Sequence, residues 1–263
     1  MKNWFFFIPL SYTFKTRLNS RKKIIAWFFS YLIPVFICTL YTFQKNSYIQ
    51  ISYLYVISVL MIYIAYEIGY IYNDAEVIKK EKAPTLRLTV TQISFYDSYK
   101  LWIYGFRLLL IITITLLLSY INVKFALSII LTSMLILGIF IIYNSLRNNW
   151  NIPLYSALVF IRYFGVFILF SSLENIIFLW FIYPLCVTIE FMSKPRFSFP
   201  LRFVYEKIDL FRAVYYIVLV VIIFVFEFKM MLISDLVLTL SLYFMFFRLV
   251  SYIVFSKKYR EEI

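Results

Sequence analysis

Long apolar runs, separated by short polar connections, divide this chain along almost its whole length. Eight of the runs are close to or longer than the roughly 20 residues that an α-helix needs to cross a bilayer. They lie at 24–43, 49–73, 100–121, 124–144, 153–172, 174–192, 209–228 and 231–255. This pattern predicts an all-α, polytopic transmembrane helical bundle of about eight helices, which forms a single integral membrane domain over residues 1–263.

The composition supports this prediction. Hydrophobic residues make up 63% of the chain and charged residues 15%, whereas soluble domains are roughly 45–50% apolar and about 25% charged. The chain has no histidine, which argues against zinc sites of the usual type and against a Ser-His or Cys-His catalytic pair. Its two cysteines, Cys38 and Cys186, lie in separate apolar runs and indicate no disulfide framework.

The basic residues fall mainly on one side of the predicted membrane. Twenty lysines and arginines lie at the termini and in alternate connections, and three lie in the other connections. The positive-inside rule then places both termini in the cytoplasm of a multi-pass protein of the inner, cytoplasmic membrane. The first 23 residues are expected to be cytoplasmic or interfacial, and 74–99 and 193–208 to be the two large cytoplasmic loops. Because topology explains the charge of +13, we expect no nucleic-acid partner.

Several charged residues lie inside the predicted helices. Arg107, Arg162 and Arg248 interrupt three apolar runs, and Glu67 lies seven residues before Asp74. Seven residues are close to two helical turns, so the two acids share one helix face. Buried charges of both signs predict a polar cavity or pairing inside the bundle. The alternative is that Glu67 only pairs with an arginine and that the arginines extend to the interface.

The second run ends in an unusual cluster of acids, amides and cations, YEIGYIYNDAEVIKKEKAPTLRL, residues 66–88. Carboxylate and amide oxygens are the ligands that Mg²⁺ prefers, and protein-bound Mg²⁺ commonly bridges to phosphates. Arginine can hold a phosphate through two parallel hydrogen bonds. The cluster therefore predicts a magnesium-bridged diphosphate with its apolar tail between the helices. A solvated, mixed-charge loop that only sets topology is the alternative.

This stretch resembles the first Asp-rich motif of the UbiA family of intramembrane prenyltransferases. In that motif an Asn-Asp pair is followed by two further acidic positions and then by Pro and Arg. Asn73 and Asp74 match the opening pair, Glu81 falls on the last acidic position, and Arg87 resembles the trailing arginine. Val77 stands at the middle acidic position, which is a departure from the motif.

A second stretch, residues 143–165, resembles the junction between helices 4 and 5 of the same family. It is most similar to the branch that transfers phosphoribosyl to polyprenyl phosphate. The matching residues are Tyr143, Arg147, Arg162 and Gly165. The second acidic motif of the family, expected after helix 6, is reduced to Glu190 with Lys194 nearby. The family usually has nine helices, so nine is the alternative to the eight counted here.

The resemblance implies a UbiA-like transferase that uses Mg²⁺ and a polyprenyl phosphate or diphosphate lipid. The reaction would be prenyl transfer to an acceptor or phosphoribosyl-type transfer to the lipid phosphate. The implied metal ligands are Asn73, Asp74 and Glu81, and the implied catalytic residues are Asp74, Glu67 and Glu190, the last two to orient the acceptor or act as base. The implied substrate-binding residues are Lys82, Arg87, Tyr143, Arg147, Arg162 and Lys194.

The alternative function is a non-catalytic or transport-type membrane protein of a lipid-linked glycan or isoprenoid pathway. Transporters of this kind often contain helices broken near the middle of the membrane, usually at Gly or Pro. The predicted helix interiors are poor in both residues, with Pro34 and Pro184 as the main exceptions. This pattern favours the transferase over the transporter.

Overall fold

The computed structural model describes residues 3–80, 85–146, 148–230 and 234–255. Within these ranges all regular structure is helical. Among the described residues, seven helices are long and apolar enough to cross a membrane, and the number is eight if a bent pair of helices forms one span. The predicted all-α bundle of about eight spans is therefore confirmed.

The spans are formed by ten helical elements and two short continuations. In chain order they are α2 (Arg21–Trp27), η2 (Phe28–Leu32), α3 (Ile33–Thr42), α4 (Tyr48–Ala75), α5 (Val90–Ser119), α6 (Val123–Ser145), α7 (Asn151–Phe164), η4 (Gly165–Phe170), α8 (Leu173–Ile182), α9 (Pro184–Met192), α11 (Ile208–Met230) and α12 (Asp235–Phe255). The connections and the N-terminal part contain η1 (Trp4–Phe6), α1 (Ser11–Thr16), η3 (Val77–Lys80), η5 (Pro195–Phe197) and α10 (Arg202–Glu206).

Two local features differ from the simple reading of apolar runs. Helix α5 begins at Val90, ten residues before its apolar run, because Thr89 and Gln92 form a capping box. Much of the predicted loop 74–99 is therefore helical. The sixth span is bent by 42° between α8 and α9, where Pro184 lacks the N–H that would continue the helix and instead starts α9.

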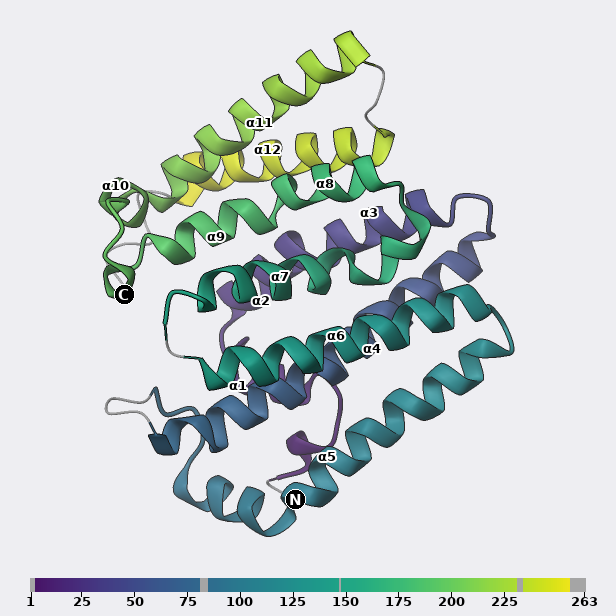
Figure 1. Ribbon diagram of the computed structural model, residues 1–263, viewed down its shortest axis with the longest axis vertical. Helices are drawn as coiled ribbons and strands as arrows, with labels where there is room; N and C mark the ends of the chain where they lie inside the picture. The colour runs from purple at the N-terminus through teal and green to yellow at the C-terminus, as the bar shows by residue number, and fades with distance from the viewer. Residues whose placement is uncertain (1–2, 81–84, 147, 231–233, 256–263) are drawn as a thin grey trace.

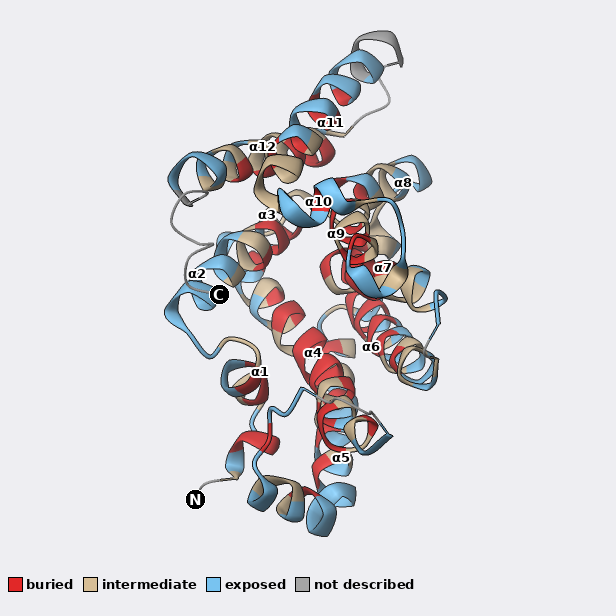
Figure 2. Ribbon diagram, turned by 90° about the vertical axis from the view of Figure 1, so that its left-hand side faces the viewer, coloured by how far each residue is buried: buried red, intermediate tan, exposed pale blue. Residues whose placement is uncertain are grey.

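Helix α4 lies at the centre of the bundle and α5 at its edge. Buried residues make up 67% of the most apolar stretch of the span that contains α4 and 22% of that of α5. Figure 2 shows the buried residues concentrated along α4. At Gly69 an added Cβ atom would lie 2.4 Å from the ring of Phe140 on α6. The glycine therefore allows α4 and α6 to pack closely and brings Phe140 against α4.

The connections after α4 and after α9 lie at the same end of the bundle, on the left of Figure 1, together with α10. The connections after α3 and after α5 lie at the other end. The predicted motif loops, 74–99 and 193–208, thus lie at one end of the molecule. Four spans separate them along the chain, and an even number of spans returns the chain to the same end.

Candidate functional site

One face of α4 carries a row of tyrosines that ends in an acid. Tyr63, Tyr66, Tyr70 and Asp74 follow one another at spacings of three and four residues, which places their side chains on the same helix face. All four side chains contact arginines that come from other elements. This row, with the arginines on it, is the candidate functional site.

Asp74 is fully buried and accepts hydrogen bonds from Tyr12 and Arg17 of the N-terminal segment and from Arg87. Arg17 donates to both carboxylate oxygens, at 2.8 and 2.9 Å. Tyr12 Oη lies 2.9 Å from Oδ2, and Arg87 Nη1 lies 3.1 Å from Oδ1. Burial by itself lowers the pKa of Arg17, but the hydrogen bonds and charge of Asp74 outweigh burial and raise that pKa above its ordinary value. One carboxylate thus faces two cations, and the cluster keeps a net positive charge.

Glu67 is also fully buried, and it binds the N-terminal segment, residues 3–17. Its carboxylate accepts from the backbone N–H groups of Leu10 and Thr13, at 3.0 and 2.7 Å. Arg107 Nη1 donates to the same carboxylate at 2.8 Å, while Arg107 Nε donates to the carbonyl of Phe6 at 3.0 Å. The predicted catalytic Glu67 therefore has a structural role in this arrangement, because its oxygens hold α1 and the Arg107 guanidinium.

Arg162, in contrast, is surrounded by aromatic rings. Its guanidinium carbon lies 4.7, 5.0 and 5.2 Å from the ring centres of Tyr31, Tyr63 and Tyr66. It donates to the hydroxyl of Tyr63, which also accepts from the indole of Trp27. Its Nε is buried without a hydrogen-bond partner, and no carboxylate of the described residues forms an ion pair with it. The residue as a whole is partly exposed.

The two arginine clusters are connected through the tyrosines of α4. The Arg17 guanidinium lies 4.5 Å from the ring centre of Tyr70, and Tyr70 lies 5.6 Å from Tyr66, which contacts Arg162. Phe140 packs edge-on against both tyrosines. The structure thus brings Asp74 and Arg162 onto one continuous face, although both were only separate sequence signals.

The predicted residues after the sixth span have partners of their own. Glu190 on α9 is held by Arg212 of α11, whose Nε and Nη2 each lie 2.7 Å from a carboxylate oxygen. Lys194 is exposed, with its ammonium 5.1 Å from the ring centre of Phe191. No contact recorded for these residues joins them to Asp74 or Arg162. The expected meeting of the two motif loops at one pocket remains a prediction.

The remaining predicted residues have mixed positions. The Asn73 amide lies 3.4 Å from Asp74 Oδ1. Tyr143 on α6 packs against Phe140 at 6.5 Å and is therefore one ring away from the tyrosine row. Three predicted residues lie outside the described part of the chain, namely Glu81, Lys82 and Arg147.

The fit of a magnesium ion depends on free carboxylate oxygens. Among the described residues, no group of three or more acids, cysteines or histidines could hold a metal ion. Both oxygens of Asp74 already accept from arginine, and Glu76 faces Tyr96 and Lys79. The described residues therefore do not fit the ion in this arrangement. With Glu81 outside the described ranges, Mg²⁺ stays a prediction from the resemblance.

Sequence reasoning missed Tyr12 and Arg17 as partners of Asp74. In the sequence, Arg17 is one of many basic residues that predict the topology. Asp74 itself indicated that such partners exist, because a carboxylate buried at a helix end needs hydrogen-bond donors. The sequence offered several cations for that role and no means of choosing among them.

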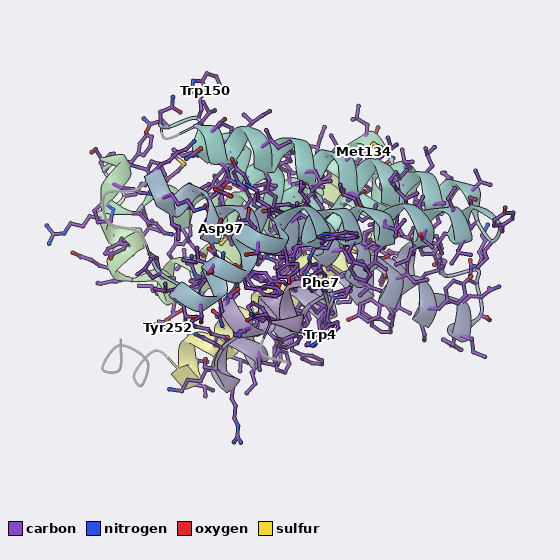
Figure 3. All side chains as sticks on the ribbon, turned by 90° about the horizontal axis from the view of Figure 1, so that it is seen from below. Trp4, Phe7, Asp97, Met134, Trp150 and Tyr252 are labelled. Atoms are coloured by element: carbon purple, nitrogen blue, oxygen red, sulfur yellow. The ribbon has the colours of Figure 1, made fainter. Side chains whose placement is uncertain are left out.

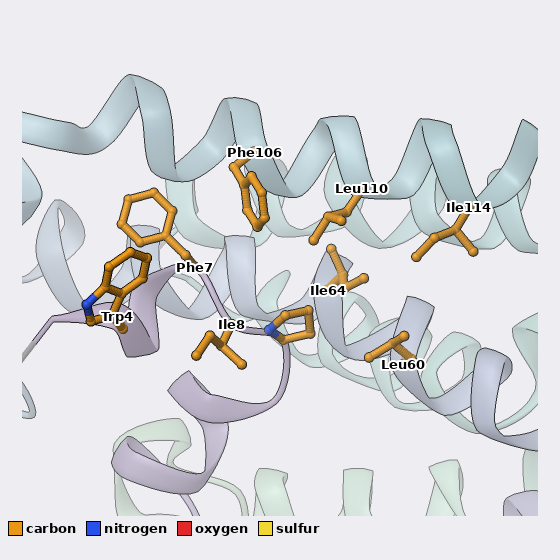
Figure 4. A pocket seen from close by; sticks show the side chains of 9 residues that line it. Trp4, Phe7, Ile8, Leu60, Ile64, Phe106, Leu110 and Ile114 are labelled. Atoms are coloured by element: carbon orange, nitrogen blue, oxygen red, sulfur yellow. The ribbon is translucent and has the colours of Figure 1, made fainter. Parts of the chain in front are cut away.

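An apolar groove of about 290 Å³ lies between the N-terminal segment and the helices α4 and α5 (Figure 4). Trp4 and Phe7 of the segment form one wall, Leu60 and Ile64 of α4 a second, and Phe106 belongs to α5. Figure 3 shows Trp4 and Phe7 close together on the N-terminal segment. Every lining side chain is apolar, so the groove has room for an apolar chain. It contains no charged group that could bind a phosphate.

No family model, no curated protein and no solved structure matches this chain. The class of protein therefore follows from the fold itself. The chain is an integral, multi-pass membrane protein of the all-α class, with buried charged clusters inside its helical bundle.

Proposed function

We propose that this chain is a UbiA-like intramembrane protein that binds a polyprenyl phosphate or diphosphate and transfers a group to or from it. Arg162 and Arg87 hold the phosphate at the tyrosine face of α4. The apolar tail of the lipid lies among the helices, where the surroundings are hydrophobic. The transferase part of the proposal is supported by the resemblance of residues 66–88 and 143–165 to the family motifs.

The observation that carries the proposal is the environment of Arg162. Even mild scales assign about 2.5–3.5 kcal/mol to an arginine at the centre of a membrane helix. Stacking against desolvated rings returns about 0.5–2 kcal/mol per ring, and it leaves the charge without a counter-ion. A phosphate would supply that charge and an acceptor for the buried Nε.

The chemistry that these residues support is electrostatic. In prenyl transfer, the bond between C1 of the prenyl chain and its diphosphate oxygen breaks, and the electron pair leaves with the diphosphate. The acceptor forms the new bond to C1 and loses a proton. In phosphoribosyl-type transfer, an oxygen of the lipid phosphate bonds to C1 of the sugar, and the sugar's diphosphate leaves. In both cases the arginines would stabilise the departing negative charge.

A second candidate, a non-catalytic protein that binds the same lipid, is favoured by the state of the acids. Glu67 is bound to α1 and to Arg107. Glu190 accepts hydrogen bonds from Nε and Nη2 of Arg212. Asp74 is bound by two arginines. None of these three predicted catalytic carboxylates is free to accept a proton from an acceptor molecule in this arrangement.

The test uses the purified full chain in lipid nanodiscs that contain a long-chain polyprenyl phosphate. We expect Arg162→Met to weaken retention of this lipid at least ten-fold relative to the wild type. Arg202→Ala is the matched control, because Arg202 lies on the surface and its one ion pair within the described part of the chain is with Glu206. Equal retention by wild type and Arg162→Met would overturn the proposal.

A second measurement separates the two candidates. Labelled prenyl diphosphate or phosphoribosyl diphosphate is added together with candidate acceptors, and labelled product is followed over time. Product that depends on Arg162 supports the transferase. Lipid retention without product from any donor supports the non-catalytic candidate.

A further inference from the structure

The short helix α1 lacks a cap of its own. Its N-cap residue is Leu10, whose φ of 68° lies in the left-handed region and whose side chain offers no acceptor. Short polar residues normally fill this position, because their side chains accept from the free N–H groups. Here Glu67 of α4 takes that role, by accepting from the N–H groups of Leu10 and Thr13.

The opposite end of α1 is held by the second acid of α4. Arg17 is the C-cap residue of α1 and binds both oxygens of Asp74. Helix α1 has six residues, about 9 Å at a rise of 1.5 Å per residue, and the seven residues from Glu67 to Asp74 span about 10 Å. The helix therefore fits between the two carboxylates, and its attachment at Glu67 determines where Arg17 reaches α4.

We propose that Arg17 is a phosphate-binding residue that the N-terminal segment brings into the site. We further propose that Arg17 and Arg87 occupy the place that a divalent cation would take at Asp74, so that the lipid phosphate binds without a metal. This inference rests on the proposed function, and it names the cationic groups and the metal requirement of that same site.

The arginines have donors left for a ligand. A guanidinium carries five N–H donors, and the recorded hydrogen bonds to Asp74 use two from Arg17 and one from Arg87. The side chains of Arg17 and Arg87 are 20% and 33% exposed, whereas Asp74 is 0% exposed. The carboxylate is thus buried behind two cations whose side chains keep exposed surface.

A metal ion and Arg17 compete for the same oxygens. Mg²⁺ binds carboxylate oxygens at about 2.0–2.1 Å. At Asp74, Arg17 Nη1 already lies 2.8 Å from Oδ2 and Arg17 Nη2 lies 2.9 Å from Oδ1. The ion would have to displace the guanidinium, and the two cations also repel each other. Binding of Mg²⁺ at Asp74 therefore requires Arg17 to leave the carboxylate.

The test measures binding of the polyprenyl phosphate by the wild-type chain in nanodiscs, with EDTA and with added Mg²⁺. We expect the two affinities to agree within about two-fold. We expect Arg17→Gln to lose at least ten-fold and Arg17→Lys to lose less, since lysine keeps the charge without the paired geometry. The matched control is Lys15→Gln, which removes an exposed cation from the same helix and should leave the affinity unchanged.

Two results would overturn the inference. One is loss of wild-type binding in EDTA with recovery in Mg²⁺, a measurement that needs no variant and so does not depend on whether Arg17→Gln folds. The other is equal affinity of a folded Arg17→Gln and Lys15→Gln. If Arg162→Met loses the lipid in either case, the proposed function stands, and only the inference about Arg17 and metal-free binding is wrong. If no arginine variant changes binding, the proposed function itself fails.

Discussion

Arg107 and Arg162 are the same residue type inside the same bundle, and each has one buried nitrogen without a hydrogen-bond partner among the described residues, but their other partners differ. Arg107 is fully buried and binds a carboxylate, Glu67, and a backbone carbonyl, that of Phe6. Arg162 is partly exposed and binds one hydroxyl and three aromatic rings, without a carboxylate partner among the described residues. The first arginine already has its anion, and the second does not.

This difference separates structure from function within one set of sequence signals. A buried charge whose partner is built into the chain contributes to the fold, and removing either partner leaves the other uncompensated. A buried cation without such a partner is a site that an anionic ligand can complete. Asp74 lies between these cases, because one carboxylate is shared by Arg17 and Arg87 and the excess charge remains positive.

The largest expected effect is the loss of stability in Arg107→Met. This change leaves Glu67 as a buried carboxylate without its cation, at a cost of about 3–5 kcal/mol. Thermal unfolding of the purified protein in detergent measures the loss, with Arg202→Ala as a surface control expected within about 0.5 kcal/mol of wild type. An Arg107→Met protein as stable as that control would show that the pair is not a structural clamp.

A double variant sharpens this first prediction. When both partners of a buried ion pair are replaced by apolar residues, the cost is often small. In Glu67→Met with Arg107→Met, however, the N–H groups of Leu10 and Thr13 also lose their acceptor. We therefore expect only partial recovery of stability relative to Arg107→Met.

The next largest effect is expected for Asp74→Ala. The change leaves Tyr12, Arg17 and Arg87 without their shared acceptor. The unsatisfied hydroxyl of the buried Tyr12 alone costs about 1–3 kcal/mol. We expect the N-terminal segment to detach from α4, so that trypsin cleaves faster at Lys15 than in wild type. Asp97→Ala is the acidic control, because Asp97 pairs with Lys79 on the surface. Equal cleavage rates in both variants would contradict the prediction.

The sequence predicted the bundle well because a membrane span is a local property. About 20 apolar residues in a row specify a helix that crosses the bilayer, whatever the rest of the chain does. The sequence also identified Glu67 and Arg162 as unusual, since charges inside apolar runs are rare, and it identified Asp74 through the acidic cluster at the end of the second run. Each of these three residues lies in a buried or partly buried cluster of the structure.

The partners of these charges were not predictable in the same way. Glu67 pairs with an arginine 40 residues further along the chain, and Asp74 pairs with one 57 residues before it. Such pairs depend on how the helices pack, and a chain with 26 lysines and arginines offers many choices. The start of α5 at Val90 was missed for a different reason, because a capping box set that boundary and the apolar run did not.

A smaller effect is expected for Tyr63→Phe. The change removes the hydroxyl that accepts from Arg162 and Trp27, and it keeps the ring on which the guanidinium lies. We expect a stability loss of about 0.5–1.5 kcal/mol. Tyr63→Leu also removes the ring and should lose about 0.5–2 kcal/mol more. If the two variants unfold at the same temperature, the rings do not hold Arg162.

The smallest effect on stability is expected for Arg162→Met, the counterpart of Arg107→Met. Removing the cation relieves an insertion cost of about 2.5–3.5 kcal/mol, and it also removes stacking on three rings worth about 0.5–2 kcal/mol each. The two contributions nearly cancel, so the lipid-free variant should unfold within about 1 kcal/mol of wild type in detergent. A loss as large as that of Arg107→Met would mean that Arg162 has a built-in partner after all. With stability unchanged, the ten-fold loss of lipid binding expected for this variant must come from the missing cation and not from a damaged fold.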